Sequence, residues 1–317
     1  MKTNKLYMIA ALLGTVLTGC QKVEENVPEE KPVAGEKWTL VVNATKGVET
    51  RAMSLDETGN APVLNASWAV GEKVAVYRNG VKAEKLLEVT AVDNDGKATL
   101  SCEDFSIEGL AKDDVLMLLF PGRDDAKWTY EGQDGKSPSV GSMASMFDYA
   151  VAEVKVDALD TQTQTITTSP TDNYKDNSGA AAFDNEQSVF RFGFNMPVKS
   201  FTISSEEGQL VISRSYQGNA WTSTTGSLTV SPGEYVPAEV SGRYNYYVAI
   251  RNENTTVADR LFFSYVDDDD GALYEAAKNI PAERLGNGNF LNASVNLTPK
   301  SFAPEASGSI SESAGVL

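Results

Sequence analysis

Apolar and polar residues alternate along several segments of the chain. In "WTLVVNAT", the side chains of Trp38, Leu40, Val42 and Ala44 fall on one face, as expected for a half-buried strand. The same period of two runs through "FRFGFNM" (190–196), "YNYYVAI" (244–250) and "LNASVNL" (291–297). Few segments have helical spacing, and "GALYEAAKNIP" (271–281) predicts a short helix that ends at Pro281. The pattern as a whole predicts an all-β protein.

Turn residues and polar stretches divide these strands into two groups. "DNDGK" (93–97) and "SPGEY" (231–235) have the composition of turns between strands. The least strand-like region is the stretch rich in Thr, Asn and Asp at about 160–187. The chain of 317 residues is long enough for two domains. We therefore predict two tandem β-sandwich domains, at 37–185 and 186–300, followed by a tail at 301–317.

The amino-terminal segment predicts export and attachment to a membrane. Lys2 and Lys5 precede an apolar stretch at 6–17, which is shorter than the roughly 20 residues that a spanning helix needs. Residues 1–19 thus read as a cleavable signal. The ending Leu-Thr-Gly-Cys20 resembles the lipobox of bacterial lipoproteins, which implies that Cys20 carries lipid. The alternative is an ordinary signal peptide with a chance cysteine.

Residues 20–36 form an acidic, Pro-containing tether. Lys22, Glu24 and Glu25 resemble the export tag of Bacteroidetes lipoproteins that reach the outer face of the outer membrane. This resemblance implies a surface-exposed lipoprotein of the outer membrane. The alternative is a linker that carries no export signal.

Charge and composition exclude several classes of function. The chain has 44 acidic and 27 basic residues, a net charge of −17, which repels nucleic acid. It contains no histidine, so histidine-based hydrolase triads and nearly all structural zinc sites are excluded. The run Asp267–Gly271 lacks the spacing of an EF-hand and predicts a charged hairpin tip. No cofactor or metal is predicted, and a glycosidase with two carboxylates is not excluded.

Cys102 and three tryptophans are the remaining chemical candidates. Cys102 follows strand-like residues and reads as a small buried side chain. Trp68, Trp128 and Trp221 would suit a sugar-binding platform, but single tryptophans in a β protein more often pack in the core. We favour core packing for all three.

Three segments stand out near the start of the folded region, "VVNATKGVETRAMS", "ASWAVGEKVAVY" and "LMLLFPG", with Gly47, the Thr50–Ala52 triplet, Trp68, Gly71 and Glu72 as their characteristic positions. Together they resemble the fimbrillin family of Bacteroidetes, which comprises subunits and anchors of protease-assembled pili. Later pieces fall in the expected order, so the resemblance covers about 36–298. It implies two transthyretin-like sandwiches.

The resemblance also implies processing. In the family an arginine-specific protease cuts behind the first strand, the strand leaves, and a strand of another subunit replaces it. Arg51 occupies that position, in the polar stretch from Lys46 to Asn60, and Ala52 would become the new terminus. The displaced strand would carry Trp38, Leu40, Val42 and Ala44, and we expect it at a sheet edge. Burial of this apolar face contributes about 5–8 kcal/mol to the stability of the fold, which is an upper value.

The resemblance implies a structural pilus component without enzymatic activity, assembled by strand exchange after cleavage behind Arg51. Its implied partners are other pilus subunits, an arginine-specific protease and the outer membrane, through lipid on Cys20. The donor strand is either "NFLNASVNLTP" (289–299) or the tail. The alternative is a non-polymerising surface lipoprotein, a tip adhesin or anchor that binds carbohydrate or a host ligand. A loop arginine without a role is the plain alternative for Arg51.

Overall fold

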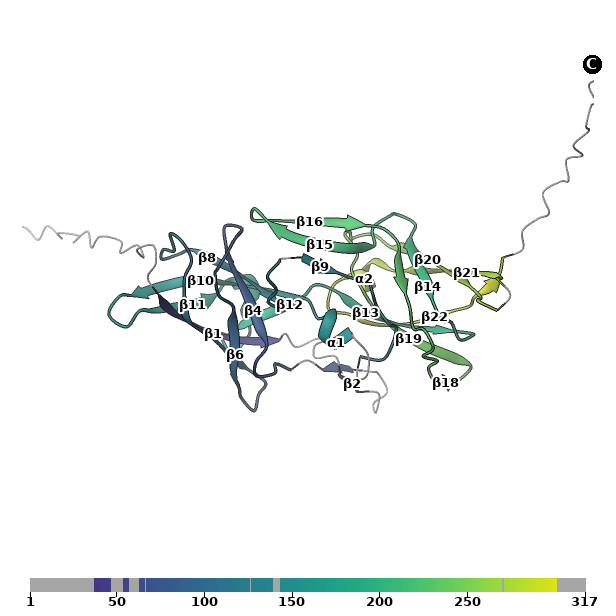
Figure 1. Cartoon of the computed structure of the whole chain (residues 1–317), viewed down its shortest axis with the longest axis horizontal. Helices are drawn as coiled ribbons and strands as arrows, with labels where there is room; N and C mark the ends of the chain where they lie inside the picture. Colours follow the sequence, from purple (N-terminus) through teal and green to yellow (C-terminus); the bar gives the residue numbers. More distant parts are fainter. Residues whose placement is uncertain are drawn as a thin grey trace, which may run out of the picture. The chain divides into compact units, whose positions relative to one another are not determined.

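The computed structural model describes residues 37–46, 54–56, 63–65, 67–125, 127–138, 143–269 and 271–300 (Figure 1). The predicted all-β class is confirmed, since the described elements are strands apart from two four-residue helices, α1 (Met143–Met146) and α2 (Ala282–Leu285), and one 3-10 turn, η1 (Asp172–Tyr174). Cys20, Arg51, Ala52 and the tail lie outside the described residues. Among the described residues, no helix has the length and apolarity to cross a membrane.

The first half of the described chain forms one sheet that closes on itself. Its strands run in the order β11-β1-β12-β10-β8-β4-β6-β7, and β1 also pairs with β7, which joins the two ends. The strands are β1 (Trp38–Lys46), β4 (Lys73–Arg78), β6 (Leu87–Val92), β7 (Ala98–Phe105), β8 (Val115–Phe120), β10 (Ala150–Asp160), β11 (Thr165–Pro170) and β12 (Ala181–Asn185), with β5 (Val81–Lys82) beside β4. The expected sandwich of two separate sheets is therefore wrong for this half, because β1 closes the sheet into a barrel.

Apart from β15 (Val211–Gln217) and β16 (Ala220–Thr225), the strands after residue 187 form two sheets that share a core. One contains β18 (Glu239–Val240), β19 (Arg243–Ile250), β13 (Ser188–Phe194) and β22 (Phe290–Val295); the other contains β17 (Leu228–Val230), β14 (Phe201–Ser205), β20 (Asp259–Val266), β21 (Leu273–Ile280) and β23 (Thr298–Pro299). Aromatic rings from the two sheets meet edge to face, with 4.9 Å between the ring centroids of Phe192 and Phe263. Such pairs stabilise a sheet-on-sheet core beyond the area they bury.

Residues that precede the predicted domain boundary also reach this second core. β9 (Lys127–Thr129) pairs with β15, which pairs in turn with β16. Trp128 and Tyr130 are buried in the same cluster as Phe190. By its contacts, the chain from residue 31 onward belongs to one compact unit, so a domain boundary at 185/186 stays a prediction.

Two local expectations are wrong. The polar region at 160–187 contains β11 and β12, both of which pair with β1, because its Thr and Ile residues suit a strand that neighbours can hold. The segment expected to be helical at 271–281 contains β21, which pairs with β20 over all eight of its residues. Partners in the sheet thus override a weak helical spacing.

The predicted turns are found where expected. β6 and β7 form a hairpin in which Val92 faces Ala98 across "DNDGK". β20 and β21 form another in which Val266 faces Leu273, so the acidic run from Asp267 is a hairpin tip. Within the described chain, no group of three or more Cys, Asp or Glu residues could hold a metal ion.

Substitution in β1 tests its place in the core. Leu40 is fully buried, whereas its neighbour Val41 is 38% exposed. We expect Leu40→Ala to lower the free energy of unfolding by about 2–5 kcal/mol, since it leaves a cavity, and Val41→Ala to lower it by less than about 1 kcal/mol. Urea denaturation of both variants measures the difference, and equal effects would show that β1 is not part of the cooperative core.

Candidate functional site

Strand β1 is hydrogen-bonded along both of its edges. On one side it runs antiparallel to β7, with Leu40 opposite Cys102 and Ala44 opposite Ala98. On the other side it runs parallel to β11 and then to β12, with Ala44 opposite Ala181. The expectation that β1 is an edge strand is therefore wrong. Loss of β1 would expose two edges of unpaired backbone groups rather than one.

The inward face of β1 is as the alternation predicts. Trp38, Leu40, Val42 and Ala44 are each 4% exposed or less and belong to one core cluster. A strand replacing β1 would therefore need apolar side chains at the same four positions.

Lys46 continues this inward face and ends β1 with a buried charge. Its side chain is only 2% exposed. The ammonium nitrogen Nζ lies 3.2 Å from Glu72 Oε2 and 3.4 Å from Asp148 Oδ2. It also lies 4.5 Å from the ring centroid of Trp68 and 4.2 Å from that of Phe120, distances at which an aromatic face attracts a cation. The sequence led us to expect that Lys46 begins an accessible polar stretch. The buried side chain shows that this expectation is wrong for Lys46.

A tight turn places Glu72 against Lys46. The backbone N–H of Ala69 donates to Glu72 Oε2 over 2.9 Å, and the N–H of Glu72 donates to the carbonyl of Ala69 over 3.1 Å. Gly71 has a φ of +93°, which glycine adopts without steric cost. Three residues of the fimbrillin-like segment thus act together: Trp68 and Glu72 contact Lys46 at the end of β1, and Gly71 permits the turn that places Glu72 there.

Asp148 completes the cluster from a distant part of the chain. It lies just before β10 and is 5% exposed. Its Oδ2 faces Lys46, whereas its Oδ1 is buried and has no hydrogen-bond partner among the residues that the structure describes. A buried carboxylate oxygen without a partner is energetically costly. We call Lys46, Glu72 and Asp148 the β1-end cluster. The alternation along β1 is a signal that could have identified Lys46 as inward-facing, whereas nothing in the sequence indicated its partners.

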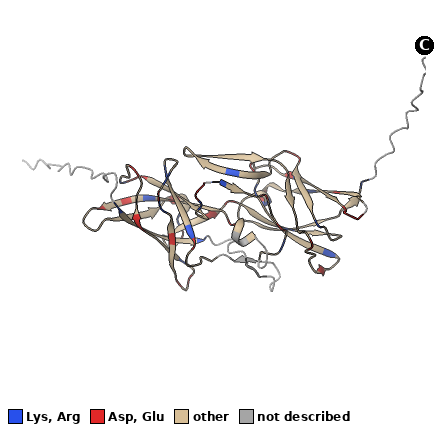
Figure 2. Ribbon diagram, viewed as in Figure 1, with Lys and Arg blue, Asp and Glu red and all other residues tan. Residues whose placement is uncertain are grey.

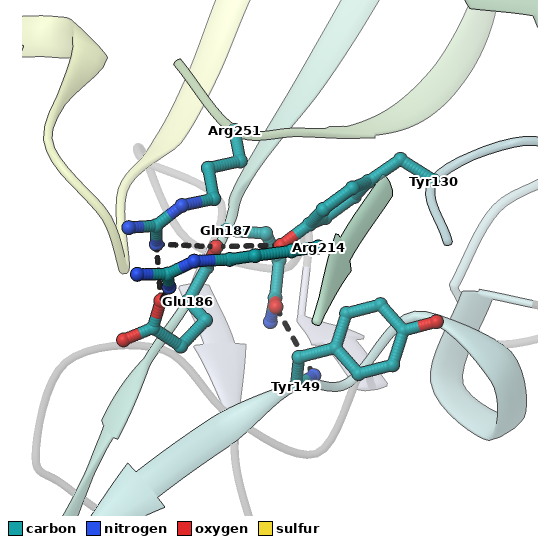
Figure 3. A network of polar contacts seen from close by, with 6 residues as sticks. All are labelled: Tyr130, Tyr149, Glu186, Gln187, Arg214 and Arg251. Atoms are coloured by element: carbon teal, nitrogen blue, oxygen red, sulfur yellow. Dashed lines mark hydrogen bonds and ion pairs between the residues drawn. The ribbon is translucent and has the colours of Figure 1, made fainter. Parts of the chain in front are cut away.

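A second buried ion cluster lies at the start of β13, and sequence reasoning did not find it (Figure 3). Glu186 forms ion pairs with both Arg214 and Arg251. The Tyr130 hydroxyl donates to the Glu186 carbonyl over 2.8 Å, and Arg251 Nη1 donates to the same oxygen over 3.0 Å. The cluster joins β15 and the end of β19 to the link between β12 and β13.

Burial dominates the electrostatics of this second cluster. It raises the pKa of the Glu186 carboxyl, and the two guanidinium groups oppose that rise. Burial also lowers the pKa of Arg214 and raises that of Tyr130. The guanidinium carbon of Arg214 lies 4.1 Å from the ring centroid of Trp221. Both guanidinium groups contact the Glu186 carboxylate, although the Nε of each has no hydrogen-bond partner among the described residues. The arrangement resembles a structural connection between segments more than a reaction centre.

The other sequence candidates lie in the core. Cys102 is buried, and burial raises the pKa of its thiol, which makes it a poor nucleophile. Trp68 and Trp128 are at most 4% exposed. Trp221 packs on Trp128 with 4.6 Å between ring centroids. Core packing is confirmed for Trp68 and Trp128, and Trp221 packs against the same core.

Two surface hollows in the second half bear on ligand binding. One is lined by Ser204, Phe262, Phe263, Ser264, Glu275, Ala276 and Ala277. The other is lined by Phe190, Phe290 and eight residues from 278–293 that include no Asp or Glu. Each contains a single partly exposed ring, since Phe263 and Phe190 are buried. Neither hollow therefore offers several aromatic rings for a sugar or a facing pair of carboxylates.

Basic and acidic residues are interspersed over the strands of the described chain (Figure 2). Many form exposed pairs, such as Lys300 with Glu275 and Lys85 with Asp104. Such a surface of mixed charge does not attract a polyanion such as nucleic acid.

No family model and no curated protein matches the sequence. One similar structure is a protein of Bacteroides fragilis described as a candidate for cell adhesion, with 11% identity and a TM-score of 0.33 over 88% of this chain and 98% of that one. Two structures of the major pilin of Streptococcus pyogenes, one of them a mutant, have 12% identity and TM-scores of 0.17 and 0.16; they cover 83% and 84% of this chain and 98% and 99% of theirs. Scores this low carry no argument about fold or function.

Removal of Glu186 tests the second cluster. Glu186→Ala leaves two buried guanidinium groups without their carboxylate, and we expect the free energy of unfolding to fall by about 3–5 kcal/mol. The matched control is Glu206→Ala, whose partner Arg260 is 3.7 Å away and about half exposed, and which should cost less than about 1 kcal/mol. Thermal and urea unfolding measure both; similar losses would show that the buried pairs add nothing.

Proposed function

We propose that the protein is a surface lipoprotein of the pilus or adhesin type that acts as an anchored structural component, with lipid on Cys20 and with β1 retained in its fold. The observation that carries this proposal is the pairing of β1 on both edges. The predicted tether at 20–36 leads directly into β1, which begins at Trp38. A pull on the tether therefore acts first on β1.

Three features resist such a pull. Two rows of backbone hydrogen bonds must break together for β1 to slide out. Four apolar side chains must leave the barrel core. The buried Lys46 must leave two carboxylates and two aromatic faces. Cleavage behind Arg51 would then cut the chain after β1 without removing β1, because the interactions that hold the strand are noncovalent and remain.

Strand exchange between subunits is the second candidate, and one observation favours it. In the closed sheet, the described pairings of β1 with β11 and β12 are the parallel ones, and the remaining pairs are antiparallel. A strand that fits between two neighbours in this way leaves a matched slot if it departs after a cut at Arg51. A donor strand from another pilus subunit would restore both rows of hydrogen bonds.

The structure bears on the choice of donor in that second candidate. The segment 289–299 is already used, because β22 pairs with β13 and β23 pairs with β21. Its donation would open the second half of the molecule. The tail at 301–317 is therefore the donor that this chain has to offer, and its alternation is poor. This weakness also favours an anchor or tip over a repeating stalk subunit.

Digestion of the full chain with an arginine-specific protease separates the two candidates. For an anchor, we expect a new terminus at Ala52 while the amino-terminal piece stays with the body and the protein remains monomeric in size-exclusion chromatography. Arg51→Lys is the matched control and should stay uncut at this position. Loss of the piece under native conditions, together with ladders of higher mass, would contradict the anchor and establish strand exchange.

A further inference from the structure

We propose that Lys46 and Asp148 condense with each other, so that a side-chain amide bond ties the end of β1 to the segment before β10. The cross-link would be made by the protein itself, with Glu72 carrying the proton. This inference does not rest on the proposed function, although it would strengthen an anchor.

The reacting groups are already in contact and shielded from water. Lys46 Nζ lies 3.4 Å from Asp148 Oδ2 and 3.2 Å from Glu72 Oε2, and the side chains of Lys46 and Asp148 are 2% and 7% exposed. Rings of Trp68 and Phe120 cover the amine. Asp148 Oδ1 has no hydrogen-bond partner in the described part of the chain. This buried oxygen therefore lacks the hydrogen bond that would offset the cost of its burial.

Other Lys–carboxylate pairs in the chain show that proximity alone does not distinguish the β1-end cluster. Lys300 Nζ lies 2.8 Å from Glu275 Oε1 and Lys85 Nζ lies 2.9 Å from Asp104 Oδ2, both closer than Lys46 is to Asp148. Their side chains are 40–49% exposed, so water solvates both ions and favours the separate charges. The β1-end cluster differs in burial and in its second carboxylate.

The condensation balances without an added reagent. A proton passes from the Lys46 ammonium to the Asp148 carboxylate, which leaves a neutral amine beside a neutral carboxyl group. The amine lone pair attacks Asp148 Cγ and forms the C–N bond. Glu72 takes a proton from the attacking nitrogen and returns it to the departing hydroxyl, the C–O bond breaks, and one water is released. Glu72 ends the step as the carboxylate it was at the start.

Two physical effects favour the product. Groups held in contact react as if at an effective concentration of about 10⁵–10⁸ M, which offsets the preference of bulk water for the separated ions. The reaction also removes two buried charges, whose desolvation opposes folding. The product keeps one oxygen of Asp148 and loses the other as water, so one buried oxygen fewer needs a hydrogen-bond partner.

Mass spectrometry of the purified, folded full chain tests the proposal directly. We expect an intact mass lower than that of the sequence by one water, and a proteolytic peptide in which the segment around Lys46 is joined to the segment around Asp148. Lys46→Arg is the matched variant, since a guanidinium can still pair with both carboxylates, and it should show the full mass. No joined peptide is expected at the exposed pair of Lys85 and Asp104.

Two further variants report on the chemistry rather than on folding. Asp148→Asn should lose the mass of ammonia instead of water, because the leaving group changes. Glu72→Gln should slow the appearance of the joined peptide after refolding by roughly 10²-fold or more. A wild-type chain of full mass would overturn the proposal. So would a water loss that persists in Lys46→Arg, as from an imide at Asp95-Gly96 or another Asp-Gly step.

The outcome is separable from that of the anchor proposal. After cleavage behind Arg51, a cross-linked strand stays with the body even in denaturant, whereas a strand held only by pairing stays in native buffer and separates in denaturant. Loss of the strand in native buffer contradicts the anchor. Separation in denaturant alone overturns the cross-link and leaves the anchor standing.

Discussion

The pairing of β1 on both edges is the constraint on which the first half of the fold depends. Because β1 meets β7 on one side and β11 and β12 on the other, the two ends of the sheet join and the barrel has no open edge at that place. Its inward side chains also fill the barrel core. The strand nearest the predicted lipid is therefore built into the domain, which favours a role that transmits load over a role that releases the strand.

Both buried ion clusters lie where distant segments of the chain meet. The β1-end cluster joins the first strand to a turn at 69–72 and to the segment before β10. The cluster at Glu186 joins the link after β12 to β15 and to the end of β19. Removal of one partner from such a cluster leaves another buried charge uncompensated, so the members of each cluster hold these segments together as a set.

Local patterns in the sequence predicted the strands that alternate strongly, such as the one containing Leu40, and the hairpin turns at 93–97 and 267–271. They failed at 160–187 and at 271–281, where the alternation is weak. There the neighbouring strands, rather than the propensity of the residues, decide the conformation. The prediction that β1 lies at a sheet edge was wrong for the same reason, since the residues of a strand do not specify which strands pair with it.

The sequence by itself determined the all-β class, the absence of histidine chemistry, the acidic charge and the residues of β1 that face inward. The same two-residue period extends to Lys46, although our interpretation of the sequence assigned that residue to an accessible polar stretch. The tertiary structure alone decided that Lys46 meets Asp148, 102 residues away, and that β1 has neighbours on both sides. Such meetings depend on how the whole chain closes its loops and packs its core, and a period of two residues carries no information about them.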